Sequence, residues 1–165
     1  MDKYIVVVTD GARARFFRLE DADMPELESG PDLVEKTARN NPELELHGED
    51  VFSTTKSGSN RSTGNGKFHG YDDHRSAHFQ ESQKRFAHQV AQDISTQLSE
   101  QKAEELILAA SPSMLGHIRT HLKDVKQKGI TIHEVSKDMA KMKPRDIHKN
   151  LAKDNLLPQR RTVHL

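Results

Sequence analysis

The sequence contains no cysteine among its 165 residues. This absence excludes disulfides, thiolate metal sites, redox dithiols and a cysteine nucleophile. Long apolar runs are also missing, since the first strongly apolar run covers only residues 4–8 and no later run is longer. A secretory signal needs an apolar segment of about 7–15 residues, and a membrane span needs about 20. We therefore expect a bacterial, cytoplasmic protein without membrane insertion.

Apolar residues are scarce, with 33% hydrophobic against 30% charged residues. Globular chains average roughly 45–50% apolar residues, so part of this chain must lie outside the core. The net charge is zero, which by itself gives no reason to expect nucleic-acid binding. However, residues 1–55 hold 13 acidic and 6 basic side chains, whereas residues 56–165 hold 12 acidic and 19 basic ones. This asymmetry indicates a basic working surface in the second part of the chain.

The first third of the sequence predicts an antiparallel β-meander. Residues 4–9 are β-branched and apolar on both faces, as in a strand that is covered on both sides. Asp10 and Gly11 supply a turn, and an acidic loop at 21–31 supplies the second connection. The expected strands span 4–9, 13–19 and 33–38.

Residues 40–74 are rich in Gly, Ser, Thr and Asn and almost lack apolar side chains. Such a segment cannot bury enough surface to order itself, so we predict a long, flexible Gly/Ser-rich loop. Beyond it, helical and strand patterns alternate. The expected elements are a helix at about 75–101 with an apolar stripe from Phe79 to Leu98, a strand at 104–110, a helix from Pro112 to Gly129 capped by Ser111, a strand at 130–135 and a helix from Pro144 through Leu151.

This order of elements predicts an α/β fold. We expect a mixed five-stranded sheet, in which an antiparallel meander is followed by parallel βαβ units, with helices packed on it in an RNase H-like arrangement. Residues 1–154 would form a single domain that contains the loop, and residues 155–165 a mobile C-terminal tail.

Three segments, YIVVVTDGARARFF, ELILAASPSMLGHIR and VSKDMAKMKPRDIHKNL, carry a family resemblance. The chain resembles, through about Leu151, the bacterial host attachment proteins, described as required for attachment to host cells. Its order of elements is also similar to the middle domain of eukaryotic and archaeal translation release factors. The resemblance implies a fold like that of the release-factor middle domain and an association with the ribosome or tRNA.

The release-factor family places a Gly-Gly-Gln motif at the tip of the loop before its long helix. The present chain has Gly-Asn-Gly-Lys at 64–67 instead, and Gln80 and Gln83 fall within the predicted helix. We therefore transfer no catalytic residue to this chain, and we do not expect hydrolysis of peptidyl-tRNA.

Cations and aromatic residues alternate near the end of the predicted loop. Flexible cations can follow a phosphate backbone, and aromatics such as Phe68 and Tyr71 can stack on bases. A solvated loop without a ligand is the alternative interpretation. The candidate RNA- or phosphate-binding residues here are Lys56, Arg61, Lys67, His69 and Arg75.

The strongest charge feature is the C-terminal third, because residues 117–161 hold 12 basic and 5 acidic side chains. Spread over two helices, they could form one basic face for RNA or acidic partners. The alternative is a solvated face that is balanced by the acidic N-terminal third, within the chain or in a homodimer. The candidate binding residues are Lys141, Lys143 and Arg145.

Two histidine pairs have the i, i+4 spacing of metal ligands on a helix. The first is His74 and His78, beside Asp72 and Asp73, and the second is His117 and His121. Neither pair has a full ligand set, and the simpler interpretation is that Asp72 or Asp73 caps a helix. We expect no metal site, with His74 and His78 as the weak candidates.

Motifs for catalysis and for cofactors are missing. There is no P-loop and no GxGxxG, and Ser111 precedes a proline rather than lying in a GxSxG turn. Asp10 ends a strand without a second acid at the end of the neighbouring one, which argues against a metal-dependent nuclease. We expect no cofactor and a non-enzymatic, RNA- or ribosome-associated protein. The alternatives are a factor that promotes host attachment, directly or indirectly, and a hydrolase that uses His69, His74 or Asp10.

Overall fold

The structure is a computed structural model that describes residues 3–44 and 67–164, with side chains in the second range from residue 77 onward. Its helices and strands, in chain order, are β1 (Tyr4–Thr9), β2 (Arg13–Glu20), β3 (Asp32–Asn40), α2 (Lys67–Gln101), β4 (Glu105–Ala109), α3 (Pro112–Arg119), α4 (Lys123–Gln127), β5 (Thr131–Val135) and α5 (Pro144–Lys153).

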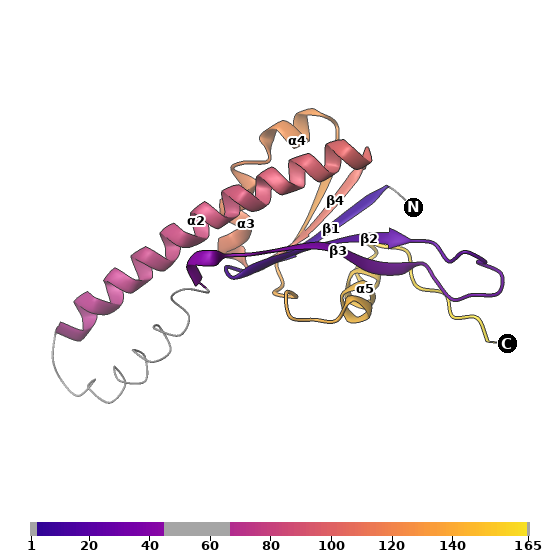
Figure 1. Cartoon of the computed structure of the whole chain (residues 1–165), viewed down its shortest axis with the longest axis horizontal. Helices are drawn as coiled ribbons and strands as arrows, with labels where there is room; N and C mark the ends of the chain where they lie inside the picture. Colours follow the sequence, from indigo (N-terminus) through magenta and orange to yellow (C-terminus); the bar gives the residue numbers. More distant parts are fainter. Residues whose placement is uncertain (1–2, 45–66, 165) are drawn as a thin grey trace.

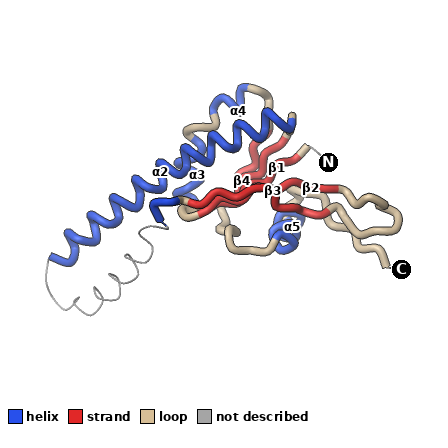
Figure 2. The backbone as a smooth tube through the Cα atoms, viewed as in Figure 1, coloured by secondary structure: helices blue, strands red, loops and turns tan. Residues whose placement is uncertain are grey.

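The strands form a five-stranded sheet in the order β3-β2-β1-β4-β5. Strand β1 lies in the centre, next to β2 and β4 (Figure 2), antiparallel to β2 and parallel to β4. Strand β5 pairs in parallel with β4. Strand β3 pairs with β2 in antiparallel orientation. The predicted α/β fold with a mixed five-stranded sheet is therefore confirmed.

Helices cover both faces of the sheet. Helices α2, α3 and α4 lie on one face, and α5 lies on the other (Figure 1). Strand β1 alternates accordingly, because Ile5 and Val7 belong to the core cluster under α2 and α3, whereas Val6 and Val8 belong to the cluster under α5. All four side chains are fully buried, as the apolar pattern of this strand predicts.

Helix α2 is longer than the sequence pattern indicates. It begins at Lys67, so residues 67–74 are helical rather than part of the predicted loop, and Asp72 and Asp73 lie inside the helix rather than at its cap. The stripe of Phe86, Val90, Ile94 and Leu98 is buried as predicted. Phe79 is 45% exposed, because the helix extends past the sheet on this side (Figure 1). No helix in the described ranges is long and apolar enough to span a bilayer.

The predicted helix between Pro112 and Gly129 is divided into α3 and α4. Ser111 caps α3 by accepting a hydrogen bond from the amide of Met114 at 3.4 Å, and Gly129 follows α4 with a φ of 82°, as predicted. Between the helices, the hydroxyl of Thr120 donates to the carbonyl of His117 at 2.9 Å. Such a local bond competes with helix continuation, which explains why one apolar stripe is shared by two helices.

Strand β3 contains a bulge that redirects its side chains. Phe16 of β2 is opposite Thr37 and Phe17 is opposite Glu35, so Lys36 has no partner in the register. An extra residue of this kind turns the following side chains to the other face of a sheet. As a result, Thr37 and Arg39 both face α2. Thr37 accepts a hydrogen bond from Gln97 of this helix at 3.0 Å, and Arg39 pairs with Asp93 of the same helix.

The C-terminal residues, for which the sequence predicts a mobile tail, contact the domain at several points. Leu157 is buried in the cluster under α5, and the carbonyl of Pro158 lies 2.7 Å from Nε2 of the buried His148. Arg161 exchanges backbone hydrogen bonds with Gly30 at 2.8 and 3.0 Å. The β2–β3 connection and the chain end are thereby held together (Figure 1).

Replacement of Leu157 with alanine tests this packing. The variant should lose about 2–4 kcal/mol of the free energy of unfolding, because removing a buried leucine side chain leaves a cavity. Urea denaturation of the full chain measures the change. The exposed neighbour Gln159 is the control, and Gln159→Ala should stay within about 0.5 kcal/mol of the wild type. Equal stability of the two variants would contradict the packed position of the chain end.

Candidate functional site

The predicted phosphate-binding residues fall into three groups. Lys56 and Arg61 lie outside the described residues. Lys67, His69 and Arg75, with the weak metal candidate His74, belong to the first turns of α2, where only the backbone is described. The third group is exposed at the N-terminal end of α5 and consists of Lys141, Lys143 and Arg145.

The cations of the C-terminal third do not share one face, although a single basic face was one of the two interpretations that the sequence left open. Lys123, Lys126 and Lys128 lie in or next to α4, whose Val125 is buried in the cluster under α2. The cations of α5 lie across the sheet, because Ile147 of that helix is buried in the opposite cluster. The physical reason is that α4 and α5 have to bury their apolar residues against different faces of the sheet, and this separates their charged residues.

Most arginines of the domain are neutralised by carboxylates. Arg119, which belongs to the expected basic face, donates two hydrogen bonds to Glu134 at 2.8 and 2.9 Å. These bonds hold the pKa of the Glu134 carboxyl below its ordinary value. The other arginine–carboxylate pairs among the described residues are Arg13–Asp10, Arg15–Glu35, Arg39–Asp93, Arg85–Glu43 and Arg160–Asp32.

The cations of the α5 region differ, because they form no ion pair with any side chain that the structure describes. They are exposed, and the nearest ion pair in sequence on this side joins Lys137 to Asp154 at 3.7 Å instead. We call this set the α5 cation surface, and it consists of Lys141, Lys143, Arg145, Lys149 and Lys153.

Helix α5 arranges three of these cations in a row. Its buried face consists of Ile147, His148, Leu151 and Ala152. Arg145, Lys149 and Lys153 follow one another at i, i+4 and i+8 on the exposed side. At a rise of 1.5 Å per residue, successive members are about 6 Å apart along the axis. Lys149 and Lys153 were not among the predicted site residues, although their spacing from Arg145 was readable in the sequence.

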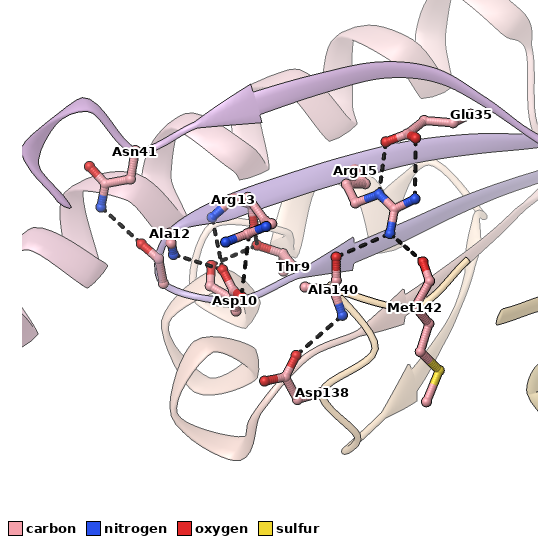
Figure 3. A network of polar contacts seen from close by, with 11 residues as sticks. Thr9, Asp10, Ala12, Arg13, Arg15, Glu35, Asn41, Asp138, Ala140 and Met142 are labelled. Carbon is pink, nitrogen blue, oxygen red and sulfur yellow. Dashed lines mark hydrogen bonds and ion pairs between the residues drawn. The ribbon is translucent and has the colours of Figure 1, made fainter. Parts of the chain in front are cut away.

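Arg15 of β2 holds the segment that carries Lys141 and Lys143 (Figure 3). Its guanidinium donates to the carbonyls of Ala140 at 3.1 Å and Met142 at 2.6 Å. The same group binds both carboxylate oxygens of Glu35 of β3, at 2.8 and 3.2 Å. Arg15 thus uses its charge to fix the backbone of the segment before α5, while the lysine side chains of that segment remain exposed.

Two of the residues considered for catalysis, Asp10 and Ser111, have structural contacts. The Asp10 carboxylate accepts hydrogen bonds from the amides of Ala12 and Arg13, both at 2.8 Å, and so stabilises the turn between β1 and β2 (Figure 3). Ser111 caps α3. Both contacts are those of turn and cap residues.

His121, which has i, i+4 spacing from His117 in the sequence, faces a histidine of another element in the structure. Nδ1 of His121 lies 3.3 Å from Nδ1 of His88 on α2, a contact between distant segments that no local spacing reveals. Within residues 3–44 and 77–164, no group of three or more histidine, aspartate or glutamate side chains is arranged to hold a metal ion. His78 is exposed on α2.

Comparison with known proteins identifies one family. A family model described as "Protein required for attachment to host cells" matches residues 5–151. The match extends from β1 to the last turn of α5 and therefore includes the sheet, Arg15 and most of the α5 cation surface. No curated protein matches the chain.

Replacement of Arg15 with glutamine tests its role in positioning this segment. The amides of residues 139–142 should exchange with solvent about tenfold faster or more, because hydrogen bonds from a charged donor contribute roughly 1.5–3 kcal/mol each. Hydrogen-exchange mass spectrometry or NMR measures the rates. Lys36→Gln is the control, since Lys36 of β3 pairs only with Glu20 among the described contacts. Unchanged exchange in Arg15→Gln would show that the segment is held by other contacts.

Proposed function

The chain belongs to the family of proteins required for attachment to host cells, and from this premise we propose that it is a non-enzymatic, cytoplasmic RNA-binding protein that associates with the ribosome. The proposal assigns the contact with RNA to the α5 cation surface. The candidate cations between Lys56 and Arg75 have no described side chains and stay a separate prediction.

One observation carries the proposal: Arg145, Lys149 and Lys153 form an exposed row on α5 and have no ion pair with any side chain that the structure describes, whereas most of the arginines described elsewhere are paired with carboxylates. Unpaired, exposed cations are costly to concentrate because they repel one another, unless an anion binds there. The row of Arg145, Lys149 and Lys153 offers successive contacts for neighbouring phosphates of one strand. A protein of zero net charge would then bind RNA through one local surface.

The order of elements also supports the ribosome as the site of binding. A three-stranded antiparallel part followed by a long helix and parallel strands is similar to the order in release-factor middle domains, which act on the ribosome. The chain lacks the Gly-Gly-Gln of that family. Our proposal is therefore binding without hydrolysis.

Neutralisation of the α5 row tests the proposal. The triple variant Arg145→Gln, Lys149→Gln and Lys153→Gln should bind single-stranded RNA at least tenfold more weakly at moderate salt. The slope of log affinity against log salt should fall by about 2, because each lost phosphate contact contributes about 0.7. Fluorescence anisotropy with a labelled oligonucleotide, over a salt series, measures both quantities.

The matched control removes the same charge from the other face of the sheet. The triple variant Lys123→Gln, Lys126→Gln and Lys128→Gln lies in or beside α4, and it should retain wild-type RNA affinity within about twofold. Co-sedimentation with ribosomes at low and moderate salt should follow the same ranking. Equal losses in both triple variants, or wild-type protein that stays in the supernatant at both salts, would contradict the proposal.

A direct or indirect role in attachment to host cells is the second candidate function, and the description of the family favours it. In the indirect case the protein acts inside the cell on the production of surface factors. In the direct case it is exported and contacts the host. The alternative of a hydrolase receives no support from Asp10, which is engaged in the β1–β2 turn.

Adherence of the bacterium that encodes the protein distinguishes these roles. A deletion strain should adhere several-fold less, and a copy of the wild type or of the α4 triple variant should restore adherence. The α5 triple variant should fail to restore it if attachment depends on RNA binding. Full restoration by that variant, together with protein in the extracellular fraction, would favour direct attachment and contradict the indirect route.

A further inference from the structure

Two histidines from distant segments face each other beside a surface groove. His88 lies on α2, and His121 follows α3. Their Nδ1 atoms are 3.3 Å apart, and their ring centroids are 4.6 Å apart with an interplanar angle of 63°. Both residues are exposed, and both line a groove of about 860 Å³ between α2 and the α3–α4 connection.

The separation of the two nitrogens is that of two ligands on one metal ion. A tetrahedral ion with metal–nitrogen distances of about 2.0–2.1 Å brings two coordinating nitrogens to about 3.3–3.4 Å from each other. We propose that Nδ1 of His88 and Nδ1 of His121 together bind a divalent transition metal ion such as Zn²⁺. Imidazole nitrogens suit Zn²⁺, Ni²⁺ and Cu²⁺, whereas Mg²⁺ and Ca²⁺ require oxygen ligands.

A neighbouring side chain is placed to support His88 in this role. The amide nitrogen of Gln92, one turn further along α2, lies 3.3 Å from Nε2 of His88. A neutral imidazole that binds a metal through Nδ1 carries its proton on Nε2 and needs an acceptor there. Rotation of the Gln92 amide presents its oxygen to that proton. Gln92 would thus orient the ring and select the required tautomer.

The proposed site leaves part of the metal coordination open. Asp93, Asp124 and Lys123 line the same groove, and Asp93 is paired with Arg39, so the charges around the groove nearly balance and the two imidazole nitrogens provide the binding. No third metal-ligating side chain joins the pair in the described part of the chain, so water or an external ligand completes the coordination. Such a site exchanges its metal and links α2 to the α3–α4 connection while the metal is bound.

Titration of the purified full chain with Zn²⁺ alone tests this site. Because other histidines also bind Zn²⁺, the readout is the ¹H–¹⁵N NMR spectrum, in which the amides of His88 and His121 should shift with a saturable, EDTA-reversible response at pH 7.5. His88→Ala and His121→Ala should each weaken this response at least tenfold. Gln92→Ala should weaken it several-fold. All of these side chains are at the surface, so the variants should remain folded.

His117→Ala is the matched control, because His117 lies one turn from His121 and it is His121 whose ring nitrogen and ring meet those of His88. It should keep the wild-type affinity within about twofold. The inference is overturned if Zn²⁺ leaves the amides of His88 and His121 unshifted, or if His117→Ala weakens the response as much as His121→Ala.

Discussion

The burial of β1 on both faces is the constraint on which the rest of the structure depends. Residues Ile5 to Val8 have no exposed surface, so each face of the central strand requires its own cover. The crossover from β3 to β4 supplies α2 on one face, and the crossover from β4 to β5 adds α3 and α4 there. In the described part of the chain, the segment after β5 covers the other face, and α5 does so with Ile147 and Leu151.

The placement of the helices on two faces of the sheet decides on which face each group of charged side chains is exposed. An amphipathic helix that buries Ile147, His148, Leu151 and Ala152 must direct its charged side chains outward. Arg15 of β2 also fixes part of this surface. Its guanidinium donates hydrogen bonds to the carbonyls of Ala140 and Met142, and these bonds hold the segment that carries the first lysines of the α5 cation surface against the sheet. The α5 cation surface is therefore a consequence of how α5 covers its face of the sheet. The pair of His88 and His121 lies on the other face, because α2 and α3 cover that one.

Several features were predictable because they depend on neighbours in the sequence. The two-faced apolar pattern of β1, the alternation in β2, the Ser111 cap and the stripe from Phe86 to Leu98 all have a local physical cause. The start of α2 was not predictable in this way, since glycine and polar residues near Lys67 favour a loop by composition. The break at Thr120 was also missed, because Leu115, Ile118, Leu122 and Val125 keep one helical period across it.

The sequence by itself determined the class of fold, the position of most elements and the surplus of cations after residue 56, because hydrophobic periodicity and charge are properties of the chain. Only the tertiary structure decided which cations remain unpaired, since pairs such as Arg39–Asp93 and Arg119–Glu134 join separate elements. It also decided that the basic C-terminal third lies on two faces and that His121 meets His88 rather than His117. The reason is the same in each case: these contacts depend on which face of the sheet a helix covers, and that choice depends on long-range burial.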